Sequence, residues 1–110
     1  MENVSSEVNE CIEECLKCYA MCTAAAMNHC LERGGQHAEP EHLRLMAACA
    51  EICRTAAHLM LISSPLHKEI CAACASTCQN CAESCETLGD MEACVAACRN
   101  CAESCERITE

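Results

Sequence analysis

Cysteine is the residue type in this chain whose number and spacing could do chemistry. The chain has sixteen cysteines in 110 residues, and the segment C-x3-C-x2-C-x3-C begins at Cys11, Cys74 and Cys94. The seven residues NCAESCE occur twice, at 80–86 and at 100–106. On a helix, two thiols four residues apart lean the same way with Cβ atoms about 6 Å apart, so both can bind one soft ion. A disulfide needs Cβ atoms about 3.8 Å apart, so the spacing favours metal binding over oxidation within a helix.

Seven cysteine pairs have this spacing. They are Cys11/Cys15, Cys18/Cys22, Cys49/Cys53, Cys74/Cys78, Cys81/Cys85, Cys94/Cys98 and Cys101/Cys105. Thiolates supplemented by thioether and imidazole select Cu(I), and zinc and iron–sulfur clusters compete for the same ligands. Zinc sites are closed sets of four ligands on short turns, and ferredoxins use a proline-terminated loop whose register differs from this one. Cu(I) is content with fewer thiolates, so each helix could bind it with its own pairs.

Glycine and proline divide the chain into four predicted helices, at about 6–33, 40–62, 65–88 and 91–108. Gly34-Gly35 should end the first helix, and Pro40 suits the first turn of the second. Ser64-Pro65 predicts the N-cap and first residue of the third helix, and Gly89-Asp90 should end that helix and cap the fourth. Long helices with short connections predict an all-α fold, an antiparallel four-helix bundle. At this length we expect a single domain, residues 1–110.

Each predicted helix carries its cysteines on one face. Steps that alternate between three and four residues return to the same side of a helix, at positions where an ordinary bundle has leucine. The chain offers few large apolar residues as a replacement, since it has no Phe or Trp and only one Tyr. We therefore expect the core of the bundle to be lined with thiols.

In these motifs the chain resembles the cytosolic copper storage proteins. The resemblance rests on CIEECLKCYAMC, SPLHKEICAACASTCQNCAESC and CVAACRNCAESC, and covers nearly the whole chain. It implies a bundle that stores several Cu(I) ions per chain, bound mainly by cysteine pairs, and that assembles as a homotetramer. It implies a role in copper homeostasis and detoxification, with no enzyme activity. A copper chaperone that delivers the ion is a candidate partner.

The candidate metal ligands are all the cysteines together with three histidines and three methionines. They are Cys11, Cys15, Cys18, Cys22, Cys30, Cys49, Cys53, Cys71, Cys74, Cys78, Cys81, Cys85, Cys94, Cys98, Cys101, Cys105, His29, His42, His67, Met46, Met60 and Met91. In an antiparallel bundle, five of them should gather at one end. These five are His29, Cys30, His42, Met46 and Met91. We predict that copper enters and leaves through this mixed-ligand end, called the mouth below.

The helical register of the cysteine face also predicts where the residues outside the seven pairs lie. In the first helix this register continues from Cys22 to His29 and leaves Cys30 about 100° away. His67 precedes Cys71 by one turn on the same face, so it is a candidate ligand at the opposite end. We expect Met21 and Met27 to lie off the cysteine face. His37 and His58 should be solvated. A second stripe, Ile12, Leu16 and Tyr19, could pack against neighbouring helices or form a subunit interface.

Composition and charge exclude several classes of function. No apolar run approaches the roughly 20 residues that cross a bilayer. The formal net charge of −10 disfavours binding to nucleic acid and to anionic membranes. No export signal is visible at the amino terminus, so we expect a cytoplasmic protein rather than a secreted disulfide scaffold. No cysteine stands apart with a histidine and a carboxylate, so no enzyme is predicted. A zinc or cadmium thiolate sink, and a disulfide-linked or redox structural protein, remain the alternatives.

Overall fold

A computed structural model describes residues 5–110 of the chain, and residues 1–4 of the predicted domain lie outside the described residues. Four long helical segments follow one another without a strand in the part that is described. In chain order the elements are α1 (Ser6–Ala24), a π-helix (Ala25–Cys30), α2 (Leu31–Arg33), a 3₁₀-helix (Gly35–Ala38), α3 (Pro40–Leu61), α4 (His67–Leu88) and α5 (Glu92–Thr109). The all-α four-helix prediction is confirmed.

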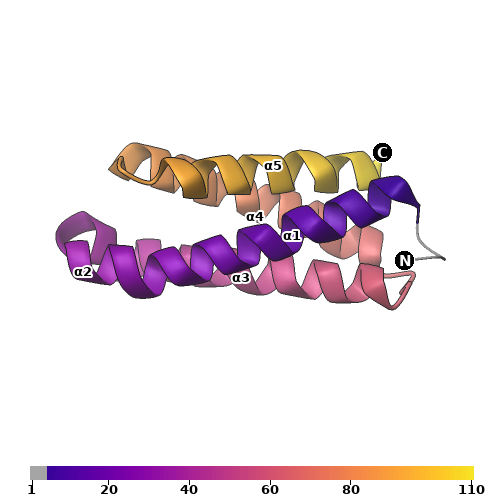
Figure 1. Ribbon diagram of the computed structural model, residues 1–110, viewed down its shortest axis with the longest axis horizontal. Coiled ribbons are helices and arrows are strands. Elements are labelled where there is room, and N and C mark those ends of the chain that lie inside the picture. Colours follow the sequence, from indigo (N-terminus) through magenta and orange to yellow (C-terminus); the bar gives the residue numbers. More distant parts are fainter. Residues whose placement is uncertain (1–4) are drawn as a thin grey trace.

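The four long helices pack side by side in an elongated bundle, about 45 Å long and 21 Å by 19 Å across (Figure 1). Around the bundle, α1 neighbours α3, α3 neighbours α4, α4 neighbours α5, and α5 neighbours α1. Because the connections are short, successive helices run in opposite directions. The turn after α4 therefore lies at the same end as α2 and the 3₁₀-helix. The α3–α4 turn, the start of α1 and the end of α5 lie at the other (Figure 1).

The end of the first helical segment and the start of α3 follow the predicted signals, and the structure adds a serine cap at the start of α1. Ser5 caps α1, because its hydroxyl accepts a hydrogen bond of 3.2 Å from the backbone N–H of Val8. Gly34 and Gly35 have φ of 69° and 57°, and this left-handed backbone ends the first segment where glycine costs no steric strain. Pro40 is the first residue of α3, where its missing N–H has no intrahelical partner to lose.

Two predicted caps were wrong. The helix expected from Ser64-Pro65 begins at His67, because Ser64 bonds within a turn instead of capping a helix. The Ser64 hydroxyl accepts from the N–H of Leu66 at 3.1 Å, and the Ser64 carbonyl accepts from the N–H of His67. Asp90 makes no cap for α5, since its carboxylate pairs with Arg33 across the end of the bundle.

The π-helix in the first segment shifts the helical register. A π-turn holds one more residue than an α-turn, and such insertions are frequent at functional sites. Because of this extra residue, the buried positions after Cys22 are Ala26 and Cys30, spaced by four and four instead of three and four. The register that was predicted to place His29 inward and Cys30 about 100° away is therefore wrong. Cys30 has no exposed surface, and the His29 side chain is 40% exposed.

Thiols fill the core, as predicted. All sixteen cysteines are buried, and the two largest fully buried side chains are Met46 and Met60. Buried alanines such as Ala56 and Ala82 let the helices approach one another closely. No helix in the described residues combines the length and the hydropathy that spanning a membrane requires.

If the π-helix arises from the insertion of one residue, the chain should tolerate the deletion of one residue there. Deleting Ala25 should convert the π-helix to α-helix while Cys30 stays inward, because Cys30 would then lie seven residues after Cys22. We expect a thermal midpoint within a few degrees of wild type, measured by circular dichroism, and a Cys30 thiol that stays protected from a thiol reagent.

Deleting Ala20 is the matched control. It removes the same residue type from regular α-helix and turns Cys22 by about 100° relative to Cys18, so the midpoint should fall clearly. Equal loss of stability in the two deletion variants would contradict the insertion.

Candidate metal centre

The interior of the bundle is a continuous column of sulfur atoms. Neighbouring Sγ atoms lie 3.5–4.0 Å apart, from Cys53 and Cys78 at 3.5 Å to Cys11 and Cys15 at 4.0 Å. An S–S bond is about 2.05 Å long, and all sixteen cysteines are free thiols. The sulfurs are thus close enough to share a metal ion and too far apart to be bonded.

Sulfur contacts between helices are as short as those within a helix. Three of the predicted pairs, Cys11/Cys15, Cys18/Cys22 and Cys74/Cys78, have sulfurs 3.9–4.0 Å apart. Between helices, Cys15 lies 3.6 Å from Cys101 and 3.7 Å from Cys105. The helical pair found in the sequence is therefore only part of the unit, and the partners across the bundle could be found only once the helices were placed.

Twelve of the cysteines form five groups whose sulfurs all lie within 4.8 Å of one another. The groups are Cys15/Cys74/Cys101/Cys105, Cys18/Cys49/Cys53/Cys78, Cys18/Cys22/Cys49/Cys98, Cys53/Cys74/Cys78/Cys101 and Cys11/Cys71/Cys105. Members recur from group to group, so at most two of the four-cysteine groups can be chosen without sharing a sulfur. A tetrahedron with metal–sulfur bonds of about 2.3 Å has edges of about 3.8 Å, which any one group fits. The overlap distinguishes this interior from a set of separate tetrahedral sites.

The remaining four cysteines, Cys30, Cys81, Cys85 and Cys94, lie outside these groups. Cys30 is at the mouth, where the structure brings together four of the five residues predicted to meet there. Its Sγ lies 3.7 Å from Nε2 of His42, 3.8 Å from Sδ of Met46 and 3.9 Å from Sδ of Met91. The column of thiols thus ends in a set that also contains thioether and imidazole.

His42 is held in the orientation that a metal ligand needs. Its Nδ1 is hydrogen-bonded to the hydroxyl of Ser84 at 2.8 Å, and its Nε2 faces Cys30. Ligand histidines are commonly fixed in this way through the ring nitrogen that does not bind the metal. Burial, and then the neighbouring His37, lowers the pKa of His42, so its ring is neutral at physiological pH. The hydroxyl partner Ser84 was not found from the sequence, because it lies on another helix.

Two other histidines at this end do not belong to the sulfur set. His29 turns outward, and its Nε2 lies 3.8 Å from the carboxylate of Asp90. The prediction that His37 is solvated was wrong, because His37 is only 5% exposed and its Nε2 donates to the carbonyl of Gly89 at 3.0 Å. The two rings meet edge to face with centroids 5.7 Å apart. They hold the turn after α4 against the end of the first segment.

At the opposite end, Met60 Sδ lies 3.9 Å from Cys71 Sγ. His67 is half-buried, and its Nδ1 donates to the carbonyl of Ser64 at 2.8 Å. The structure therefore places Met60 next to the thiol column and His67 one turn away from it on α4. Of the residues predicted to be peripheral, Met27 and His58 are exposed and Met21 is half-buried.

The thiol of Cys30 at the mouth and that of the neighbouring Cys94 are protonated at neutral pH. Burial raises the pKa of Cys94 to about 11. Burial, and then the nearby Cys85, also raises the pKa of Cys30. Every lysine and arginine is exposed, so no cationic side chain inside the bundle can balance a thiolate charge. A bound metal ion would supply the positive charge that balances thiolates at Cys30 and Cys94.

Comparison with known proteins gives the family. The sequence profile described as copper storage protein matches residues 4–110. A structure of the Nmul_A1745 protein of Nitrosospira multiformis is 50% identical, with a TM-score of 0.92 and coverage of 94% of each chain. The Cu(I)-bound copper storage protein BsCsp3 is 37% identical with a TM-score of 0.87, covering 96% of this chain and 100% of its own. A cysteine-rich protein of Bacillus subtilis, YhjQ, is 40% identical over 79 residues, which are 72% of this chain and 66% of that relative.

The profile spans the four helices and all sixteen cysteines, and the likeness to BsCsp3 covers 96% of this chain. This chain belongs to the copper storage protein family.

Proposed function

We propose that this protein stores copper as Cu(I), with many ions per chain held by cysteine thiolates inside the bundle. The observation that carries the proposal is the overlap of the cysteine groups, in which residues such as Cys53 and Cys101 each belong to two groups. A shared thiolate can bridge two ions, so the groups form one continuous container. The BsCsp3 protein, whose fold this chain shares, is a copper storage protein in its Cu(I)-bound form.

Charge balance favours Cu(I) over a divalent ion. Sixteen thiolates carry sixteen negative charges, and the interior has no cationic side chain to offset them. One Cu(I) per thiolate leaves no net charge, whereas a zinc ion with four thiolates of its own keeps two negative charges. Unbalanced charge is costly in a buried, low-dielectric site. Soft sulfur ligands also select Cu(I) directly.

A zinc or cadmium sink is the second candidate, because a single four-cysteine group fits a tetrahedral ion. Such a sink would use the interior poorly. Only two tetrathiolate ions fit without a shared sulfur in the present arrangement, and sixteen cysteines supply at most four. The two candidates therefore differ in capacity.

The mouth is proposed as the place where copper enters and leaves. Cys30, His42, Met46 and Met91 offer one thiol, one imidazole and two thioethers, and thioether and neutral imidazole bring no charge to the ion. Such a set should bind Cu(I) more weakly than the thiolate column behind it. Met60 and His67 are proposed as ligands that close the column at the other end, next to Cys71.

We also propose the cellular location of the protein, its subunit number, its role and its copper donor. Free thiols require a reducing compartment, which favours the cytoplasm and can be tested by cell fractionation. A homotetramer is proposed from the family resemblance, and light scattering on the purified protein gives the subunit number. In the stripe considered as an interface, Ile12 is buried within the chain while Leu16 is 41% exposed, so Leu16 is the member available for a contact between subunits. The proposed role is storage rather than catalysis, within one domain, and a copper chaperone is the proposed donor.

An anaerobic titration of the reduced protein tests the storage role. Metal per chain is read by gel filtration and elemental analysis, with Cu(I) and Zn(II) run in parallel. We expect at least one Cu(I) per cysteine pair, rising toward one per thiolate, and two to four zinc ions. Because their raised pKa values keep the thiols of Cys30 and Cys94 protonated at pH 7.5, loading of these two cysteines should release about one proton per Cu(I), measured with a pH indicator. Saturation at one or two copper ions would contradict storage.

The mouth is tested by replacing His42 and Met46 with leucine together. We expect copper loading and removal by a chelator to slow about tenfold, the scale expected when metal-site ligands or their supports are lost. Capacity should change little, because the thiolate column is intact. Met27→Leu, an exposed position, is the matched control. Unchanged rates in the double variant would refute the mouth as the route.

A further inference from the structure

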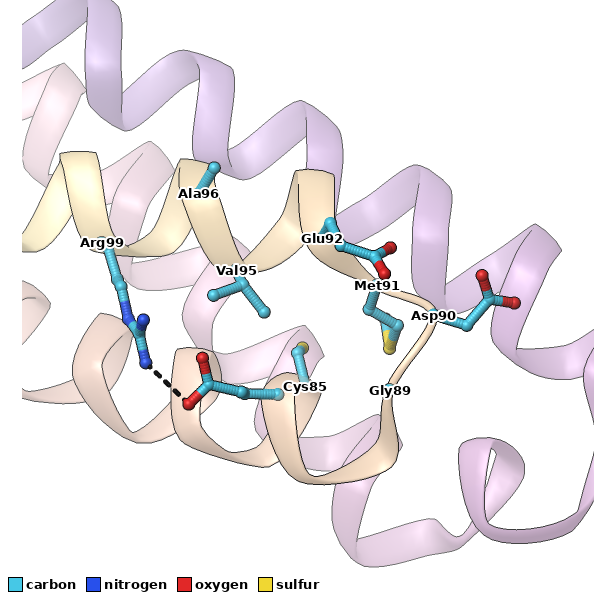
Figure 2. Close-up of a pocket in the computed structure, with 9 residues that line it drawn as sticks. Cys85, Gly89, Asp90, Met91, Glu92, Val95, Ala96 and Arg99 are labelled. Atoms are coloured by element: carbon cyan, nitrogen blue, oxygen red, sulfur yellow. Dashed lines mark hydrogen bonds and ion pairs between the residues drawn. The ribbon is translucent and has the colours of Figure 1, made fainter.

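A surface pocket lies between the end of α4 and the start of α5, beside the turn that joins them. Its volume is about 350 Å³. Figure 2 shows the side chains that surround it, with Arg99 at one side, Asp90 at the other, and Cys85 and Met91 between them. Pockets that bind small molecules begin at about this volume. His42 of the mouth set faces elsewhere, along α3 and α4, where it lines a separate hollow together with Ser84.

Soft ligands lie at the inner side of this pocket. Met91 is 5% exposed, and its Sδ is 3.9 Å from Cys30, so it connects the pocket with the interior. Cys85 has no exposed surface and is one of the four cysteines outside the compact groups. A metal ion that reached Met91 from the pocket would therefore meet free thiols next. Gly89 and Asp90 both have positive φ, which places Met91 at this position just before α5.

The charged side chains of the pocket are separated. Arg99 is at one side, where it pairs with Glu86 at 3.1 Å. Asp90 and Glu92 are on the side of the turn (Figure 2). Glu86 is already paired with Arg99, and Asp90 is paired with Arg33, so Glu92 is the carboxylate of the pocket that has no basic side chain beside it among the described residues. The pocket fits a molecule that carries a carboxylate at one end and an ammonium group at the other, because Arg99 can bind the carboxylate and Glu92 the ammonium group.

Cu(I) must arrive bound to a carrier, and a carrier is too large for the tightly packed sulfur column. Transfer therefore needs a place where the carrier can dock while its metal meets a protein sulfur. We propose that this pocket binds the Cu(I) complex of a short cysteine peptide, a low-molecular-weight thiol with separated ammonium and carboxylate groups. This inference rests on the proposed storage function and adds a route that reaches Met91 of the mouth through this pocket instead of through the hollow that His42 lines.

The transfer is a ligand exchange without a change in oxidation state. The carrier's Cu–S bond breaks as the ion passes to the thioether of Met91 and on to the thiol of Cys85. A Cu–S bond to Cys85 forms, and the proton of Cys85 leaves on the carrier's thiolate. Arg99 holds the carboxylate of the carrier in place of Glu86, so Arg99 is a positioning residue and Met91 is the first protein ligand.

The test measures loading of the reduced full chain from Cu(I)–glutathione by stopped flow, over a range of complex concentrations. Glutathione has the required carboxylate and ammonium groups. Docking predicts a rate that saturates with concentration, whereas loading from Cu(I)–2-mercaptoethanol, which lacks both groups, should rise linearly. A loading rate of the wild-type protein that rises linearly with the concentration of Cu(I)–glutathione would overturn the proposal.

Two variants and a control separate docking from storage. Arg99→Gln should raise the half-saturating concentration about fivefold, the effect of losing one charged contact, with the maximal rate and the capacity unchanged. Met91→Leu should lower the maximal rate at the same half-saturating concentration. Arg54→Gln, which removes an exposed arginine paired with Glu51 on α3, is the control and should change neither. Equal half-saturating concentrations for Arg99→Gln and wild type would refute the site. A wild-type capacity of only one or two copper ions would refute storage instead.

Discussion

The structure depends on the buried thiols at the centre of the bundle, which contact one another and have no lysine or arginine among them. Sulfur atoms lie 3.5–4.0 Å apart along the bundle, and every lysine and arginine is outside. As neutral thiols they behave as small hydrophobic groups, so the metal-free bundle can pack around them. Once ionised they repel one another unless metal charge enters with them. The same atoms therefore serve as a core when protonated and as a container when metallated, and proton loss links the two states.

Several elements were predictable because local signals determine them. The cysteine faces follow from steps of three and four residues, and Gly34 and Pro40 bound the helices at the expected places. The starts of α4 and α5 were less predictable, since Ser64 and Asp90 find partners in a turn and across the bundle end. A serine or aspartate before a helical pattern does not reveal which of these partners it takes.

The candidate site was predictable in kind and only partly in arrangement. Spacing identified the thiols but not their contacts across helices, such as that between Cys15 and Cys101, which depend on how the helices are rotated. The π-helix exchanged the positions of His29 and Cys30, because one extra residue in a turn changes which side chain faces inward. Ser84 behind His42, and the burial of His37, likewise depend on the tertiary structure. The result is a mouth with the three predicted sulfur ligands and with one histidine instead of two.

The central claim is that the thiolates are shared between ions, and X-ray absorption at the copper edge of the fully Cu(I)-loaded protein tests it most directly. Shared thiolates predict a first shell of sulfur together with a clear copper–copper contribution, because bridged ions lie close to each other. Copper surrounded mainly by nitrogen or oxygen, or sulfur-bound copper with no copper neighbour at full loading, would contradict the account.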